Sequence, residues 1–199
     1  MKKKLLFVLT VGTTVLLSSC GKAPQVEIDA AYTAIEQAKS VGANVYVAED
    51  FIALQDSMSS VSENVELENG KLFKNFDKVK SQLALVNAMA IETKVKAEIR
   101  KEEIKLEVAN LKMELDSIIL EDQDLVSQAP KGKEGTAALE AIKGDISAIE
   151  ASVIEVENFV SEDQLVAALN KATAAKEKAL AINDELNEVI AKYTKHKRN

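Results

Sequence analysis

Apolar residues recur every three or four positions along nearly the whole chain after residue 24, the spacing of one face of an α-helix. The pattern predicts five helices, separated at Gly42, at Gly70, in the segment 129–136 and at residues 161–164. The apolar rows of these helices are, in chain order, Ile28, Ala31, Ile35 and Ala38; Phe51, Leu54, Met58, Val61 and Val65; Phe76, Val79, Leu83, Val86 and Ala90, continued by Ile104, Val108, Leu111, Leu115 and Ile118; Leu139, Ile142, Ile146, Ile149, Val153, Val156 and Val160; and Leu165, Ala168, Ala172, Ala175, Ala179, Ile182, Leu186, Val189 and Tyr193.

The third segment, residues 71–128, contains no glycine or proline. As one helix it would be on the order of 85 Å long. Near its middle Ile91, Val95 and Ile99 recur every four residues, which rotates the apolar row onto another face. We therefore expect the helix to change packing partners there. A break near Glu92 and Thr93 is the alternative.

The two later boundaries carry specific turn and cap signals. Residues 129–136 include a proline and two glycines and are predicted to form a loop. The sequence Ser161-Glu162-Asp163-Gln164 fits a capping box that opens the last helix. The fold class expected is therefore all-α, an elongated and coiled-coil-like antiparallel bundle of about five helices. Residues 26–128 would form helices one to three, and residues 137–199 a helical hairpin that packs on the long third helix.

The N-terminus has the organisation of an export signal. Three lysines precede thirteen mostly apolar residues, 5–17, a run too short as a helix to cross the ~30 Å hydrocarbon core of a bilayer. The sequence Leu17-Ser18-Ser19-Cys20 that follows resembles the lipobox of bacterial lipoproteins. The resemblance implies a signal peptide over 1–19, cleavage before Cys20, a diacylglycerol thioether on Cys20 and a lipidated tether over 20–25. The alternative is an ordinary secretory signal in which the cysteine occurs by chance.

The residue after the cysteine bears on the destination of such a lipoprotein. Position 21 is Gly, whereas Asp at this position marks inner-membrane retention in enterobacterial-type lipoproteins. By that resemblance we expect an outer-membrane lipoprotein facing the periplasm, with the outer face of the cytoplasmic membrane as the alternative. Removal of 1–19 takes away three lysines, so 22 basic and 32 acidic residues remain, a formal charge of −10. In the sequence, no basic patch for anionic headgroups follows directly after the anchor.

Composition argues against several kinds of chemistry. One cysteine and one histidine cannot build a usual zinc site, so no metal is expected, and no cofactor besides the covalent lipid. The acidic run Glu121-Asp122-Gln123-Asp124 lacks the glycine and terminal glutamate of a calcium loop and is interpreted as a polar helix end. A net charge of −7 argues against a nucleic-acid partner. We do not expect an enzyme.

The C-terminus is the one concentrated basic patch of the sequence. Its candidate contact residues for an anionic envelope polymer are Lys192, Tyr193, Lys195, Lys197 and Arg198. The simpler interpretation is that these cations complement the C-terminal end of a helix dipole.

The stretch from Cys20 to about Ala90 resembles a family of small helical bacterial lipoproteins whose common domain has no assigned function. The features that carry the resemblance are Cys20, Pro24, the row of Ala31, Ile35 and Ala38, Gly42-Ala43 followed by Tyr46, and the helix start Glu49-Asp50-Phe51. The family implies alanine-spaced antiparallel helices and no particular mechanism. This chain is less alanine-rich and adds the long Lys/Glu segment.

Together these features predict a lipid-anchored cell-envelope protein that acts by helix-mediated protein contacts, as a spacer, scaffold or assembly partner. Apolar strips left exposed would favour self-association or a partner helix. One alternative is a carrier whose bundle binds a lipid or a peptide. Another is a non-covalent peptidoglycan tether that uses the basic C-terminus.

Overall fold

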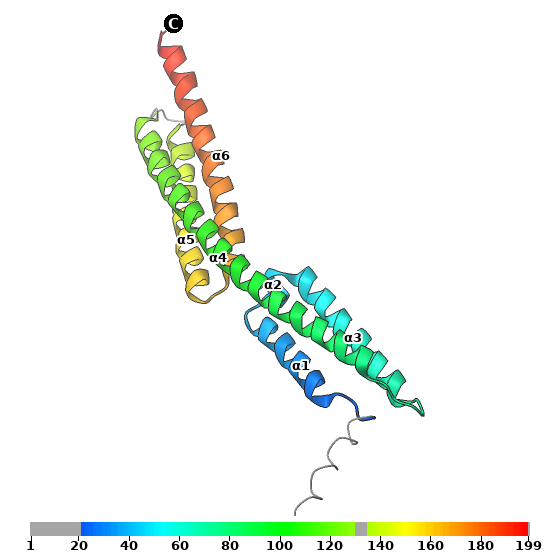
Figure 1. Cartoon of the computed structure of the whole chain (residues 1–199). Helices are drawn as coiled ribbons and strands as arrows, with labels where there is room; N and C mark the ends of the chain where they lie inside the picture. Colours follow the sequence, from blue (N-terminus) through cyan, green and yellow to red (C-terminus); the bar gives the residue numbers. More distant parts are fainter. Residues whose placement is uncertain (1–20, 130–134, 199) are drawn as a thin grey trace, which may run out of the picture. The chain divides into compact units, whose positions relative to one another are not determined.

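A computed structural model describes residues 21–129 and 135–198, and this part of the chain is all-α, as predicted (Figure 1). The helices divide into two compact units, one ending at Arg100 and the other beginning at Lys101. The long helix α4, Asp77–Gln128, supplies its first half to unit 1 and its second half to unit 2. Helices α1, α3, α5 and α6 pack against α4.

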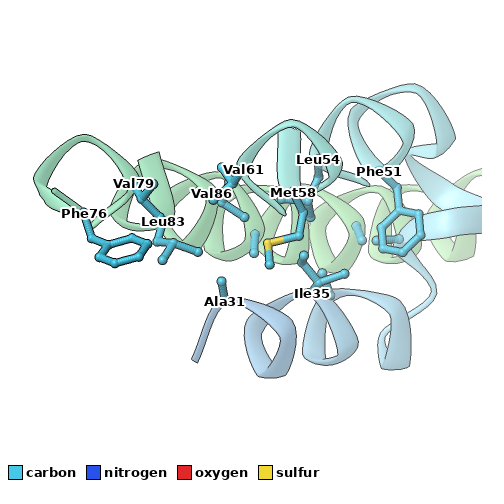
Figure 2. Close-up of a cluster of buried hydrophobic side chains, with 14 residues drawn as sticks. Ala31, Ile35, Phe51, Leu54, Met58, Val61, Phe76, Val79, Leu83 and Val86 are labelled. Atoms are coloured by element: carbon cyan, nitrogen blue, oxygen red, sulfur yellow. The ribbon is translucent and has the colours of Figure 1, made fainter. Parts of the chain in front are cut away.

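Unit 1 is built from α1 (Gln25–Ser40), α2 (Ala43–Tyr46), α3 (Ala48–Asn69) and the first half of α4. Helices α1 and α3 run antiparallel and enclose a core with α4 (Figure 2). The core residues are those of the predicted rows, namely Ala31, Ile35 and Ala38 of α1, Phe51, Leu54, Met58 and Val61 of α3, and Phe76, Val79, Leu83, Val86 and Ala90 at α4, together with Ala43 and Ala97.

The turn after α1 depends on Gly42, which has a φ of 88° in the left-handed region and ends the helix as predicted. Its amide donates a 2.9 Å hydrogen bond to the carbonyl of Lys39. The ring of Tyr46 lies over it, so that a methyl group on residue 42 would stand 2.7 Å from Tyr46 Cε2. Residues 43–46, expected to be a link, form the single helical turn α2, which raises the number of helices in the described residues from five to six.

Helix α3 ends at Asn69, directly before Gly70, as predicted. The next helix begins at Asp77 and not at residue 71, so this predicted boundary was wrong by six residues. The amide of Asp77 donates a 2.9 Å hydrogen bond to Asn75 Oδ1, which competes with helix formation before it. Phe76, in the same segment, is buried in the core.

Helix α4 is continuous through residues 92 and 93, so the alternative of a break there was wrong. The expected move of the row onto Ile91, Val95 and Ile99 was also wrong, because these side chains are 57%, 47% and 55% exposed. The buried face instead keeps its regular spacing of three and four residues through small side chains. Those side chains are Ala90, Thr93 and Ala97.

Unit 2 contains the second half of α4 with α5 (Gly135–Ser161) and α6 (Leu165–Arg198). Helix α5 begins inside the segment expected as a loop, most of which, residues 130–134, lies outside the described residues. The buried side chains again follow the predicted rows: Ile104, Val108 and Leu115 of α4, Ile142, Ile146, Ile149, Val153 and Val156 of α5, and Leu165, Ala168, Ala172, Ala175, Ala179, Ile182 and Leu186 of α6.

The capping box expected between the last two helices does not form. Ser161 is the last residue of α5, and its hydroxyl donates a 2.8 Å hydrogen bond back to the carbonyl of Asn158. The turn is closed instead by Asp163, which has a φ of 60° and whose carboxylate pairs with Lys101 of α4. The turn therefore depends on a contact between helices, which local sequence does not reveal.

Candidate interaction surfaces

The predicted lipid attachment site, Cys20, lies outside the described residues, so its acylation stays a prediction. The structure does describe the residues that follow it. Pro24 is buried and Ala23 packs against the core of unit 1. The chain is therefore fixed to unit 1 within a few residues of Cys20.

The basic C-terminal patch lies at the end of α6. The side chains of Lys192, Tyr193 and Lys195 are exposed. The side chains of Lys197 and Arg198 are not among those that the structure describes. Lys192 Nζ is 2.8 Å from Glu188 Oε2, and this hydrogen bond raises the pKa of Lys192 and lowers that of Glu188. The pair is an exposed contact between neighbouring turns of α6, of the kind that stabilises a helix end.

A row of exposed apolar side chains runs along the second half of α4, which we call the α4 row. It consists of Leu106, Met113 and Leu120, which are 67%, 63% and 67% exposed and are spaced seven residues apart. Seven-residue spacing places them on one strip of the helix, away from Val108 and Leu115, which are buried in unit 2. Helix α4 is thus apolar on two faces, and the bundle covers one of them.

Acidic side chains dominate the part of α4 that carries this row. Residues 102–124 include eight Asp or Glu and two Lys. Both lysines are engaged in ion pairs, with Lys105 Nζ 2.7 Å from Glu102 and Lys112 Nζ 3.0 Å from Asp116. These pairs cancel part of the charge, Asp122 is buried and Glu114 is paired with Lys176 of α6, so a smaller net negative charge remains on the exposed surface of this part of α4.

An open groove of about 680 Å³ lies between α4 and α6 in unit 2. Its apolar floor includes Leu111, Leu169 and Ala174. Charged and amide side chains line the rest, and Lys176 of α6 forms an ion pair there with Glu114 of α4. The groove is wide open to solvent and lined by both apolar and polar side chains, unlike the enclosed apolar pockets that hold lipids and other small ligands.

The sequence interpretation of 121–124 as a polar helix end was wrong for Asp122, which is fully buried against α6. Its Oδ1 accepts a 2.9 Å hydrogen bond from Asn183 Nδ2, and its Oδ2 is buried without a hydrogen-bond partner. Burial raises the pKa of Asp122, and the negative charge of Glu121 adds to that effect. Residue 122 lies on the same face of α4 as Leu115 and Ile119, but the burial of a carboxyl group there depends on α6 and was not visible in the sequence.

Neither a metal-binding cluster nor a membrane span is found among the described residues. No group of three or more His, Cys, Asp or Glu side chains among them is arranged to hold a metal ion. None of the helices described is both long and apolar enough to span a bilayer.

Comparison with known proteins gave no match to a family model, to a curated protein or to a solved structure. The resemblance to a family of helical lipoproteins therefore rests on the sequence features alone.

Proposed function

We propose that this protein is a lipid-anchored component of the cell envelope, held through Cys20 at the periplasmic face of the outer membrane, that acts without catalysis by binding a partner helix. The attachment is supported by the export signal and the lipobox. The mode of action is supported by one structural observation, the α4 row, in which three large apolar side chains lie exposed at heptad spacing.

The occupant that fits the α4 row is an amphipathic helix with an apolar strip and flanking lysines or arginines. Heptad spacing matches the repeat of a second helix packed alongside. Exposed acidic residues over 102–124 outnumber the two lysines there, even with Asp122 buried and Glu114 paired with Lys176. This excess favours a basic partner and disfavours a second α4, because two acidic surfaces would repel each other. The partner is therefore expected to be another protein and not a second copy of this chain.

The test uses the full chain and two synthetic helical peptides of about three heptads. Both peptides carry the same leucine strip, one flanked by lysines and the other by glutamates, and binding is followed by fluorescence anisotropy. The lysine peptide should bind the wild-type protein, and the double variant Leu106→Ser/Met113→Ser should weaken binding by about tenfold or more. Ile154→Ser is the matched control, because Ile154 is 60% exposed on α5 of the same unit.

Other results would contradict the proposal. Equal binding of the two peptides would show that charge does not select the partner, and absence of binding would remove the α4 row as a docking surface. Sedimentation of the wild-type chain by itself tests whether a second copy of the chain occupies the α4 row. A dimer that is lost in Leu106→Ser/Met113→Ser would assign the row to a second copy of the chain.

A further inference from the structure

The loop between α3 and α4 presents two adjacent large apolar side chains almost entirely to solvent. Leu72 is 97% exposed and Phe73 92% exposed, the highest values among the large apolar residues of the described chain. They are adjacent, at the end of a helical hairpin. A pair of this kind is unlike the single apolar residues that are normal on protein surfaces.

The loop holds these side chains outward through specific contacts. Phe76, three residues after Phe73, is 5% exposed and packs in the core of unit 1. The carboxylate of Glu68 accepts hydrogen bonds from Lys71 Nζ at 2.5 Å and from the amide of Asn75 at 3.5 Å. These two hydrogen bonds lower the pKa of Glu68, so the carboxylate is charged and holds both sides of the loop. The ring of Phe76 is therefore buried in the core, and the ring of Phe73 is exposed to solvent.

Lysines lie close to the exposed pair in the chain, although the protein is acidic as a whole. Residues 66–81 contain four lysines, two glutamates and one aspartate, whereas the full chain has a formal charge of −7. Lys71 and Lys74 flank the pair directly, and Lys78 and Lys80 lie on the first turn of α4. Exposed apolar side chains with lysines beside them are typical of segments that enter a lipid interface, since the lysines reach anionic headgroups while the apolar groups enter the acyl region.

The loop lies at the end of unit 1 where the chain enters from residue 21. Because α1 and α3 run antiparallel, the end of α3 lies beside the start of α1, and Phe76 and Ala31 lie near the same end of the core (Figures 1 and 2). Helix α3 has 22 residues and α1 has 16, a difference of roughly 9 Å in helix length. Ala23 and Pro24 are packed on unit 1, so only residues 21 and 22 separate this end of the unit from residue 20.

We propose that the α3–α4 loop is a second membrane contact, in which Leu72 and Phe73 insert into the interfacial region of an anionic lipid surface and the neighbouring lysines bind its headgroups. This inference rests in part on the proposed attachment at Cys20, which would bring the same end of unit 1 to the bilayer. The loop supplies the basic patch that the residues directly after the anchor lack in the sequence. A single acyl-bearing residue lets the protein rotate freely, whereas two contacts fix its orientation on the surface.

The test uses the absence of tryptophan from the chain. In the full chain, Phe73→Trp introduces a single reporter at the loop, and Ile52→Trp is the control, because Ile52 is 57% exposed near the opposite end of α3. Each protein is reconstituted with vesicles of phosphatidylcholine and phosphatidylglycerol, with and without lipids brominated in the acyl chains. Emission from residue 73 should shift to shorter wavelength and be quenched by the bromolipids, while emission from residue 52 should not change.

Several outcomes would overturn the inference. Emission from residue 73 that stays at the wavelength of exposed tryptophan would exclude insertion, and a shift without vesicles would assign the loop to a protein contact. Insertion that is equal in neutral vesicles and unaffected by Lys71→Gln/Lys74→Gln would remove the headgroup role of the lysines. Combining Phe73→Trp with Cys20→Ala separates the two proposals. Quenching in an unacylated chain supports the loop contact alone, and an acylated chain without quenching supports the anchor alone.

Discussion

Asn183 of α6 donates a 2.9 Å hydrogen bond to the carboxyl group of Asp122 of α4, which is fully buried and has one oxygen without a partner. An ionised carboxylate in this position would lose most of the hydration that stabilises its charge. A protonated carboxyl group loses less hydration free energy on burial than a carboxylate does, which is why the pKa of Asp122 is raised. This contact couples the packing of α4 on α6 to pH.

The first prediction concerns Asp122→Asn. Since the folded-state pKa is raised above the unfolded value of about 4, the folded protein binds the proton more tightly. The wild-type free energy of unfolding should therefore fall as pH rises from about 4 through the raised pKa. Asp122→Asn removes this titration and should be more stable than wild type by about 1 to 3 kcal/mol at pH 7. Urea unfolding followed by circular dichroism at pH 4.5 and 7.5 measures the difference.

Asp124→Asn serves as the control for this change, because Asp124 is exposed two residues away. As a surface substitution, Asp124→Asn should change the free energy of unfolding by no more than about 0.5 kcal/mol. The difference in unfolding free energy between wild type and Asp122→Asn should change between pH 4.5 and pH 7.5. An equal difference at both pH values would contradict the assignment of the titration to Asp122.

The second prediction compares two glycines. Gly42→Ala should destabilise the protein by about 1 to 3 kcal/mol, because its φ of 88° is strained for alanine and the added methyl group would meet the ring of Tyr46 at 2.7 Å. Gly144→Ala should stabilise it by about 0.5 to 1 kcal/mol, because Gly144 lies within α5 and its missing methyl group would meet nothing within 4 Å. The changes in unfolding free energy of the two variants, measured by chemical denaturation, should have opposite signs. Changes of the same sign would refute the backbone argument at residue 42.

The third prediction uses two leucines of α4 that are two residues apart. Leu83 is 2% exposed in the core of unit 1, whereas Leu85 is 66% exposed. Leu83→Ala should cost about 2 to 5 kcal/mol of unfolding free energy through lost burial and the cavity left behind. Leu85→Ala should change it by no more than about 0.5 kcal/mol. Similar losses for both variants in thermal and urea unfolding would mean that the packed face of α4 is assigned wrongly.

The fourth prediction concerns the proposed lipid. Cells that express the wild-type chain should incorporate labelled palmitate into it, and Cys20→Ala should abolish both the label and the shift in mass that cleavage before residue 20 produces. Ser19→Ala is the control, because it keeps a small residue before the cysteine and should still be labelled. A Cys20→Ala protein that carries the label would show that the lipid is attached elsewhere or not covalently.

Most of the helices and their core residues could be predicted from the sequence. A row such as Leu139, Ile142, Ile146 and Ile149 repeats with the helical period, and no other regular structure buries that set on one side. Gly42 and Gly70 were also recognisable as helix ends, because few other residues suit those positions. Local chemistry is enough for such features, since the residues that determine them are neighbours in the chain.

The centre of α4 shows where this reasoning fails. Ile91, Val95 and Ile99 are the more hydrophobic set, yet Ala90, Thr93 and Ala97 are buried. Ala90 and Ala97 lie in the core of unit 1, where they continue the spacing of Leu83 and Val86 along the same face of α4. Packing geometry therefore outweighed side-chain hydrophobicity, and it left an apolar strip exposed.

The sequence by itself determined that the chain is helical, which face each helix buries in most places, and that the N-terminus resembles a lipoprotein signal. Only the tertiary structure decided which polar groups are buried and which apolar groups are not. Asp122 meets Asn183 across 61 residues of sequence, and Phe76 occupies the core position that leaves Phe73 outside. The physical reason is that burial depends on the neighbouring helices, whose positions are set by contacts far apart in the chain.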